Sequence, residues 1–155
     1  MAHPGKKIPD FNLPATRCEN LGTSDLSGKF CVIYFYPKDS TPGCTTETND
    51  FTQLYAEFQQ RGCEVVGFNH NPMKSHIKFE QKQKIPFPLV SDEEKTSLQN
   101  FDVWKQKKFM GREFMGVVRT TLLVGPDGVV LRRYDSVKVK DHAKQVLQDL
   151  AELQD

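Results

Sequence analysis

The sequence FCVIYFYPKDSTPGCTTET, residues 30–48, joins a continuous apolar run to a loop rich in proline and glycine and then to a helix. The run from Phe30 to Tyr36 combines β-branched and aromatic residues without alternation, which is typical of a strand covered on both faces. Apolar residues then recur at helical spacing from Thr45 to about Gln60, and Gly62 stands where a helix would end. This stretch predicts a central strand, a loop and a helix.

The same alternation continues along the chain. Cys63–Phe68 is predicted to be a second buried strand, and the segment from Pro72 to about Lys84 a second helix. Further on, Val117–Val124 and Val129–Tyr134 flank Gly-Pro-Asp-Gly, and this turn sequence predicts an antiparallel hairpin. We therefore expect one α/β domain over residues 1–155, with a mixed central sheet flanked by helices.

Three other segments complete this prediction. A closing helix is expected behind Asp141 as a possible cap, because an apolar stripe follows it, made of Ala143, Val146, Leu147, Leu150 and Leu153. The segment Ile85–Leu89 is expected to be a surface connection. Lys105–Gly116 is expected to be a second one, in the form of a flap or small hairpin.

The composition excludes some classes of partner. The 21 Lys and Arg residues nearly balance the 20 Asp and Glu residues, so no broad positive field is present to attract nucleic acid or an anionic membrane. No apolar run approaches the roughly 20 residues of a membrane-spanning helix, and the N-terminus lacks the apolar core of a secretory signal. We expect a cytoplasmic protein that binds neither nucleic acid nor membrane.

Four cysteines, Cys18, Cys31, Cys44 and Cys63, are scattered along the chain without a C-x-x-C pair. This spacing favours neither a zinc ribbon nor a dithiol redox motif. In a reducing compartment such thiols start free, and any disulfide would be catalytic or transient.

Cys44 stands out because it follows the end of a predicted strand and begins a helix, where α/β proteins carry their sites. The unpaired amides of a first helical turn and the helix dipole stabilise a thiolate, which is the nucleophilic form of cysteine. Pro37 and Pro42 stiffen the approach, Gly43 lets the backbone come close, and Thr41 offers a hydroxyl to sulfur or substrate. We prefer this interpretation to the alternative of a buried, inert thiol.

The pattern Pro37-x-x-x-Thr41-x-x-Cys44 resembles the active-site pattern of the peroxiredoxins, and residues 34–48 resemble their bacterioferritin comigratory protein, or peroxiredoxin Q, subfamily. Further motifs match in order over nearly the full chain: KSH (74–76), PFPLVSD (86–92), VWK (103–105), FMGREFMG (109–116), RTTLLVGPDG (119–128) and V-K-V-x-x-H (137–142). The resemblance implies a thioredoxin-like fold and a thiol-dependent peroxidase of hydrogen peroxide and organic hydroperoxides, with no metal or organic cofactor.

The resemblance also assigns roles. Cys44 would be the nucleophile that is oxidised to a sulfenic acid, Thr41 the hydroxyl that orients thiolate and peroxide, and Pro37 the shield over the pocket. Arg119 would be the cation that stabilises the thiolate and the charge on the leaving oxygen. The backbone amides of Gly43 and Cys44 would complete this polar cradle.

The chain departs from the subfamily at the resolving cysteine. Asn49 stands five residues after Cys44, where many members carry a second cysteine, and the segment Lys74–Lys84 contains no cysteine either. The simplest hypothesis is a one-cysteine cycle in which thioredoxin, glutaredoxin or glutathione reduces the sulfenate. The subfamily resemblance also implies a monomer.

The other thiols have different expected roles. Cys31 and Cys63 open predicted strands and are expected to be small buried hydrophobes. Cys18 lies in a polar turn and is the candidate for an unorthodox resolving or intermolecular thiol.

Two alternatives remain open. A general thiol-disulfide oxidoreductase normally needs two paired cysteines, whereas a peroxide sensor would relay the oxidation of Cys44 to a partner.

The remaining polar features are weaker signals. His76 is expected to cap or pack on the second helix. A basic cluster with neighbouring Phe109 and Met110 is either a solvated face or a docking site for an acidic reductant, and it contains Lys105, Lys107, Lys108 and Arg112.

Overall fold

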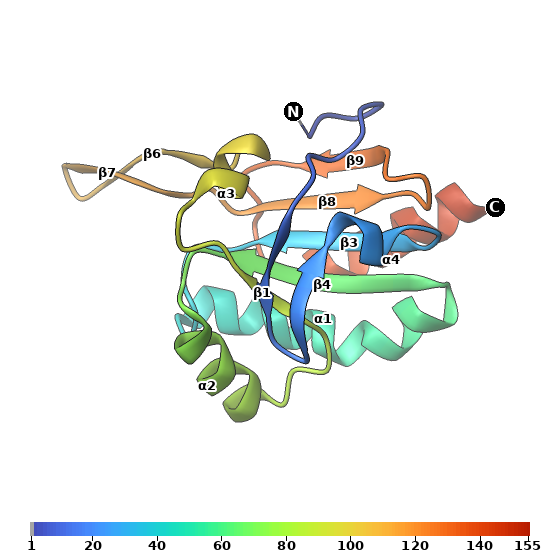
Figure 1. Ribbon diagram of the computed structural model, residues 1–155, viewed down its shortest axis with the longest axis horizontal. Coiled ribbons are helices and arrows are strands. Elements are labelled where there is room, and N and C mark those ends of the chain that lie inside the picture. The colour runs from blue at the N-terminus through green and yellow to red at the C-terminus, as the bar shows by residue number, and fades with distance from the viewer. Residues whose placement is uncertain (1) are drawn as a thin grey trace.

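The computed structural model describes residues 2–155 and contains a seven-stranded sheet, a separate two-stranded hairpin and flanking helices (Figure 1). The strands are β1 (Asn12–Ala15), β2 (Cys18–Gly22), β3 (Phe30–Phe35), β4 (Cys63–Asn69), β5 (Leu89–Ser91), β6 (Trp104–Phe109), β7 (Arg112–Val117), β8 (Thr120–Val124) and β9 (Val130–Tyr134). The helices are η1 (Thr23–Leu26), α1 (Pro42–Gln60), α2 (Met73–Gln83), α3 (Thr96–Asn100) and α4 (His142–Gln154). None of the helices within residues 2–155 is both long and apolar enough to cross a membrane.

The large sheet has the strand order β2-β1-β5-β4-β3-β8-β9. Its central strand β3 pairs in parallel with β4 and antiparallel with β8, so the sheet is mixed as predicted. The end of β3 is marked by Phe35, which stands opposite Phe68 of β4 and Thr120 of β8. The segment that leaves β3 here leads directly into α1.

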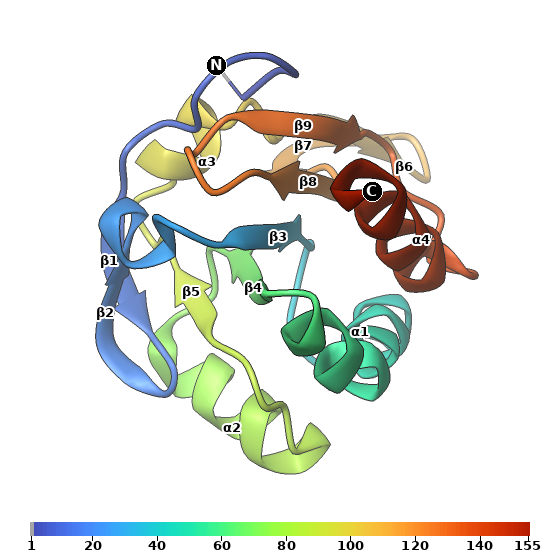
Figure 2. The same cartoon turned by 90° about the vertical axis from the view of Figure 1, so that its right-hand side faces the viewer.

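Two apolar cores lie on the two faces of the sheet because the side chains of β3 alternate between them. Val32 and Tyr34 point to the face covered by α1, α2 and α4, whereas Ile33 and Phe35 point to the face covered by the N-terminal segment and α3. Figure 2 shows α1 and α4 together on one side of β3 and β8, with α3 and the β1–β2 pair away from them. Burial on both faces confirms the prediction that residues 30–36 contain a strand covered on both sides.

Several predictions need correction. The segment Val117–Val124 is not one strand: Val117 ends β7, and the chain passes through Val118 and Arg119 before β8 begins. The reason is that the Val118 amide donates to the Val103 carbonyl at 2.8 Å instead of joining the sheet ladder. The predicted hairpin is therefore formed by β8 and β9 alone, and Lys105–Gly116 folds mainly into the hairpin of β6 and β7.

The connection Ile85–Leu89 is buried rather than on the surface. Ile85 is 1% exposed, and Phe87 and Leu89 are fully buried in the core beneath α1 and α2. The predicted capping bond of Asp141 is also not formed: Asp141 precedes α4, but it has a left-handed backbone (φ 60°) and its side chain makes no cap hydrogen bond. The N-terminal pair β1 and β2, and the short β5, were not predicted.

Candidate active site

Cys44 lies in the first turn of α1, directly beyond the carboxyl end of β3. Thr41 has an extended backbone and caps the helix, and Pro42 is the first helical residue, so α1 begins three residues before the predicted start. Cys44 is consequently the third residue of α1, where backbone amides lack intrahelical acceptors and the dipole favours negative charge. Its thiol is 1% exposed.

Arg119 contacts Cys44 from a different part of the chain. Its Nη2 donates to Cys44 Sγ at 3.3 Å, and its Nη1 donates to Glu47 Oε1 at 2.7 Å. The arginine belongs to the short link between β7 and β8, and its carbonyl is held by the Val137 amide at 2.9 Å. Burial would lower the pKa of Arg119, but the charges of Glu47 and Cys44 raise it, so the guanidinium remains a cation beside the sulfur.

Glu47 is a site residue that the sequence reasoning missed. It lies one helical turn after Cys44, is 1% exposed, and its Oε2 has no hydrogen-bond partner among the described residues. Burial raises the pKa of Glu47 to about 7, against the opposing effect of Arg119. The spacing Cys-x-x-Glu was a usable signal, because residues three apart on a helix share a face.

The other three site residues predicted near Cys44 surround the first turn of α1. A Cβ on Gly43 would lie 3.4 Å from Arg119 Nη2, so the glycine leaves room for the guanidinium. Pro37 is half-buried at the start of the loop. The hydroxyl of Thr41 donates to the Lys38 carbonyl at 2.9 Å rather than to the sulfur of Cys44, and it can turn to another acceptor only by giving up that bond.

A buried polar network fixes the loop between β3 and α1. The carboxylate of Asp39 accepts hydrogen bonds from Tyr36 Oη at 2.6 Å and Ser75 Oγ at 2.7 Å, and its Oδ2 lies 2.7 Å from His76 Nδ1. The other ring nitrogen of His76 lies 3.0 Å from the Val90 carbonyl, which can only accept. His76 therefore does more than pack on α2: it connects that helix to the loop that presents Cys44.

This network also sets the direction in which the pKa of Asp39 is shifted. Burial alone would raise the pKa of its carboxyl, but the hydrogen bond and charge of His76, with the bonds from Tyr36 and Ser75, hold it below its usual range. The loop is thus attached to β4, β5 and α2 through polar contacts as well as through the backbone.

None of the other three cysteines is brought to Cys44. Cys31 and Cys63 are buried, as predicted, and burial raises the pKa of both thiols. Cys18 is exposed on the edge strand β2, four strands from β3, which corresponds to roughly 19 Å at the usual strand spacing. A disulfide needs Cα atoms within about 7 Å, so this separation between β2 and the strand that leads to Cys44 does not support a Cys18–Cys44 bridge within one molecule.

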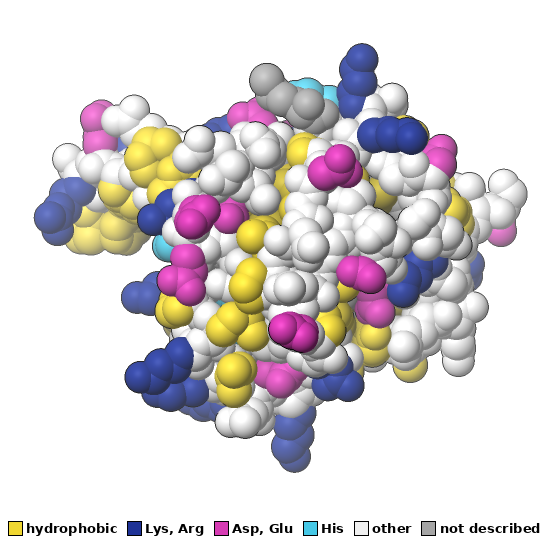
Figure 3. Space-filling model, in the orientation of Figure 1, with side chains coloured by type: hydrophobic (Ala, Val, Ile, Leu, Met, Phe, Trp, Pro, Cys, Tyr) yellow, Lys and Arg dark blue, Asp and Glu magenta, His cyan; other side chains and the backbone are white. Residues whose placement is uncertain are grey.

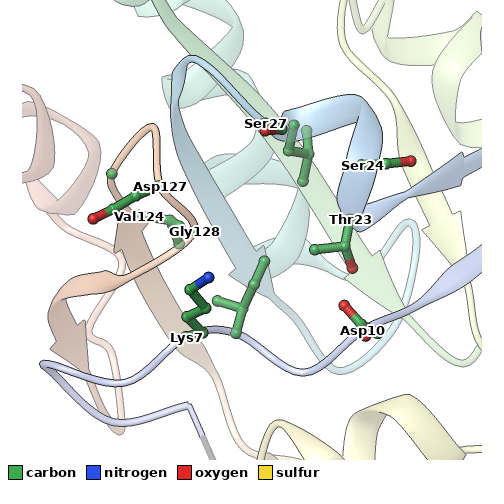
Figure 4. A pocket seen from close by; sticks show the side chains of 11 residues that line it. Lys7, Asp10, Thr23, Ser24, Ser27, Val124, Asp127 and Gly128 are labelled. Carbon is green, nitrogen blue, oxygen red and sulfur yellow. The ribbon is translucent and has the colours of Figure 1, made fainter.

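Two further features lie apart from Cys44. A pocket of about 270 Å³ is lined by Lys7, Asp10, Thr23 and Asp127 (Figure 4). It includes Val124, which pairs with Cys31 near the start of β3, so it lies at the opposite end of the sheet from Cys44. Within residues 2–155, no group of three His, Cys, Asp or Glu side chains is arranged to hold a metal ion.

Comparison with known proteins places this geometry in a family. Residues 4–133 match the AhpC/TSA family. The chain is 41% identical to peroxiredoxin Bcp of Bacillus subtilis over 149 residues, which is 96% of this chain and 95% of that protein. It is 46% identical to peroxiredoxin Bcp of Xanthomonas campestris over 121 residues, covering 78% of this chain and 76% of the relative.

Solved structures agree with the sequence relatives. A mutant of PrxQ from Xylella fastidiosa superposes with a TM-score of 0.94 at 33% identity, covering 100% of this chain and 99% of the other. The bacterioferritin comigratory protein of Xanthomonas campestris, studied for its alkyl peroxide reduction activity, superposes with a TM-score of 0.88 at 39% identity, covering 94% and 92% of the two chains. The chain therefore belongs to the AhpC/TSA family and, within it, to the Bcp/PrxQ peroxiredoxins, which are thiol-dependent peroxidases.

Proposed function

We propose that Cys44 is the peroxidatic cysteine and that it works in a one-cysteine cycle on hydrogen peroxide and organic hydroperoxides. The observation that carries this proposal is the hydrogen bond from Arg119 Nη2 to Cys44 Sγ in the first turn of α1. A guanidinium and a helix N-terminus both favour negative charge on sulfur, and together they give a nucleophile at a defined position.

In the first step, the thiolate of Cys44 attacks the outer oxygen of the hydroperoxide. A sulfur–oxygen bond forms, the oxygen–oxygen bond breaks, and the inner oxygen leaves as alkoxide or hydroxide and takes a proton to become alcohol or water. Arg119 can stabilise the charge that develops on the leaving oxygen, and in this scheme the amides of Gly43 and Cys44 complete the polar cradle. In this scheme Thr41 turns its hydroxyl to the peroxide, and Pro37 limits the entry of water.

The second step needs an electron donor from outside the chain. Cys31 and Cys63 are buried in the sheet, and Cys18 lies on the far edge strand, and these positions support a cycle without an internal disulfide. An external thiol attacks the sulfenic acid instead, and thioredoxin, glutaredoxin and glutathione are the candidates. Four free thiols also suit a reducing cytoplasm, and we infer that the chain acts there as a monomer.

Mass spectrometry of the reduced protein after one equivalent of hydrogen peroxide, with a sulfenic-acid trap, tests the cycle directly. We expect one trapped adduct, on Cys44, and no loss of two hydrogens that would indicate an internal disulfide. A Cys44–Cys18 bridge that disappears in Cys18→Ser would replace the one-cysteine cycle with a two-cysteine cycle.

Substitution at the site gives a second test. Cys44→Ser should abolish peroxidase activity, because a serine hydroxyl is almost entirely un-ionised at neutral pH. Arg119→Lys should lower kcat/KM for peroxide by about tenfold or more, because one ammonium cannot bond both sulfur and Glu47 in the same geometry. Stopped-flow peroxide reduction with dithiothreitol measures both, and retained activity in Cys44→Ser would contradict the assignment of the nucleophile.

The alternative of a peroxide sensor that relays oxidation to a partner differs in turnover. A peroxidase consumes many equivalents of peroxide per molecule when a reductant is supplied, whereas a sensor stops near one equivalent until its partner is added. Counting the equivalents consumed at fixed protein concentration distinguishes the two.

A further inference from the structure

The hairpin of β6 and β7 carries most of the exposed large hydrophobic side chains among the described residues. Four of the six belong to it: Phe109 (66% exposed), Met110 (85%), Phe114 (46%) and Met115 (51%). Figure 1 shows the hairpin projecting from the body of the molecule, and Figure 3 shows yellow apolar and blue basic side chains together on this projection. Apolar groups exposed in this number usually mark an interaction surface.

The register of the hairpin separates its side chains into two unlike faces. Lys107 pairs with Phe114 and Phe109 pairs with Arg112, so these side chains share one face with Lys105. We call this set, Lys105, Lys107, Phe109, Arg112 and Phe114, the basic face. It contains three cations, two aromatic rings and no carboxylate of the hairpin itself.

The single acidic residue of the hairpin lies on the other face. Glu113 pairs with Lys108 across the strands and accepts a hydrogen bond from Gln106 Nε2 at 2.8 Å. Among residues 2–155, the one ion pair made by the basic face joins Lys105 Nζ to Asp102 Oδ2 at 3.7 Å, with both side chains well exposed. The face therefore keeps a net positive charge beside its two phenyl rings.

The basic face is also the face on the side of Cys44. At the base of the hairpin, Trp104 and Val117 point the other way and pack into the core under α3, whereas Cys44 belongs to the core under α1. Burial and the charge of Arg119 lower the pKa of Lys107, while Cys44 raises it, so Lys107 lies within electrostatic reach of both. Lys107 Nζ also donates to the Val117 carbonyl at 3.0 Å, so its ammonium lies at the base of the hairpin, next to the link that carries Arg119.

This placement meets a requirement of the second half of the cycle. The sulfur of Cys44 is 1% exposed, so a foreign thiol reaches it only if its carrier is held beside the site. A carrier with carboxylates around an apolar rim complements three cations and two phenyl rings.

We propose that the basic face docks an acidic dithiol protein and orients its thiol toward oxidised Cys44, which rests on Cys44 being the peroxidatic cysteine. The partner thiolate attacks the sulfenic sulfur, a sulfur–sulfur bond forms, and the oxygen leaves as water after protonation. The partner's second thiol then attacks its own half of this mixed disulfide, releasing the Cys44 thiolate and an oxidised partner. Two electrons pass from the dithiol to the sulfenic acid in the process.

The test uses two charge reversals on the same hairpin. Arg112→Glu changes the basic face and Lys108→Glu makes the same change on the opposite face, so the second is the matched control. The probes are an acidic thioredoxin with its reductase, and dithiothreitol as a small neutral thiol. We expect Arg112→Glu to lower kcat/KM for thioredoxin by about fivefold or more, with Lys108→Glu changing it less than twofold. Both variants should keep the parent rate with dithiothreitol.

Ionic strength and the apolar part of the face give independent readouts. Raising salt from low to physiological levels should lower kcat/KM for thioredoxin in the parent protein, and this dependence should weaken in Arg112→Glu. Phe109→Ser should raise KM for thioredoxin without changing the rate of peroxide reduction in a single turnover.

Other outcomes overturn the docking proposal while leaving the proposed function intact. One such outcome is that Arg112→Glu and Lys108→Glu change kcat/KM for thioredoxin equally, or that neither changes it. Another is that only glutathione supports turnover and that Arg112→Glu leaves kcat/KM for glutathione unchanged. Binding to anionic phosphatidylglycerol vesicles that is lost in Arg112→Glu, without an effect on thioredoxin, would assign the face to a membrane surface instead. Failure of Cys44 to reduce peroxide with dithiothreitol would contradict the proposed function itself.

Discussion

At the residue scale, the chemistry of the site depends on one guanidinium that serves two acidic groups. Arg119 bonds the sulfur of Cys44 through Nη2 and the carboxyl of Glu47 through Nη1. Because Glu47 is almost fully buried and its pKa is raised to about 7, the charge opposite Arg119 changes within the physiological range of pH. The cation at the sulfur is therefore only partly neutralised below neutral pH and more fully above it.

This raised pKa makes stability depend on pH in a defined direction. The folded protein holds the Glu47 proton up to about pH 7, whereas the unfolded chain loses it near its ordinary value of 4.5. Between these values the folded state binds more protons, so the free energy of unfolding falls as pH rises, by on the order of 3 kcal/mol in total. Glu47→Gln cannot ionise and keeps an oxygen for Arg119, so it should be more stable than the parent above pH 7.

Urea unfolding at pH 4.5, 6 and 8 measures this effect. The curves of parent and Glu47→Gln should converge at the lowest pH and separate progressively as the pH rises. A difference that is the same at all three values would show that Glu47 does not titrate in this range.

At the element scale, the Asp39–His76 pair connects the loop before α1 to α2, and both side chains are buried. His76→Gln should lower the free energy of unfolding by about 3 kcal/mol at pH 7, because it removes the ring nitrogen that faces a buried carboxylate. The double variant Asp39→Asn/His76→Gln should be more stable than the sum of the single effects implies, with a coupling energy above about 1 kcal/mol. Chemical unfolding of the four proteins gives this double-mutant cycle.

The pH dependence of the same pair has the opposite sign to that of Glu47. The folded-state pKa of Asp39 is below its ordinary value of 3.8, so the stability from the pair is present above that value and is lost as the pH falls through the folded pKa. The parent protein should therefore lose more stability than His76→Gln between pH 5 and pH 2. Equal losses in the two proteins would indicate that His76 does not stabilise the carboxylate.

Another element-scale contact fixes the distance between β4 and its neighbours. A Cβ on Gly67 would come within 2.7 Å of Leu89 Cδ2 and 3.0 Å of Tyr34 Oη, and that hydroxyl is bonded to Thr48 Oγ1 of α1 at 2.9 Å. Gly67→Ala should thus destabilise the protein by about 1–3 kcal/mol and disturb the turn of α1 that follows Cys44. Thermal unfolding measures the loss, and adding Leu89→Val should restore part of it. An unchanged Tm in Gly67→Ala would mean that β4 and β5 separate easily.

At the scale of the whole molecule, the positions of the four thiols decide how oxidation can link chains. Cys18 is the exposed one, and burial and the charge of Asp25 raise the pKa of its thiol, which makes it a weak nucleophile. Analytical ultracentrifugation before and after hydrogen peroxide should give one species of about 17.7 kDa in both samples. A dimer that appears on oxidation and disappears in Cys18→Ser would instead assign Cys18 an intermolecular role.

The sequence predicted those parts of the fold in which local pattern and tertiary environment agree. The apolar runs of β3 and β4 are buried on both faces, and the helical stripe of α1 faces the sheet, so their periodicity was a reliable signal. The prediction of a surface connection at Ile85–Leu89 was wrong. The prolines of this segment indicate a loop, but Ile85 and Phe87 pack into the core that forms only when the helices cover the sheet. The prediction of one strand over residues 117–124 was wrong because the amide of Val118 donates to an acceptor outside the large sheet.

The sequence by itself determined that a single cysteine follows the central strand, because a proline and glycine loop after an apolar run and before a helical stripe has few other ways to fold. It also located the candidate nucleophile and the absence of a cysteine at position 49. The family resemblance named Arg119 as the cation for the thiolate. Only the tertiary structure decided that this residue, 75 positions away in the chain, bonds the sulfur, that Glu47 pairs with the same guanidinium, and that Cys18 lies on a distant edge strand. Such contacts depend on strand order and on the burial of charge, and neither is encoded in the local periodicity of a sequence.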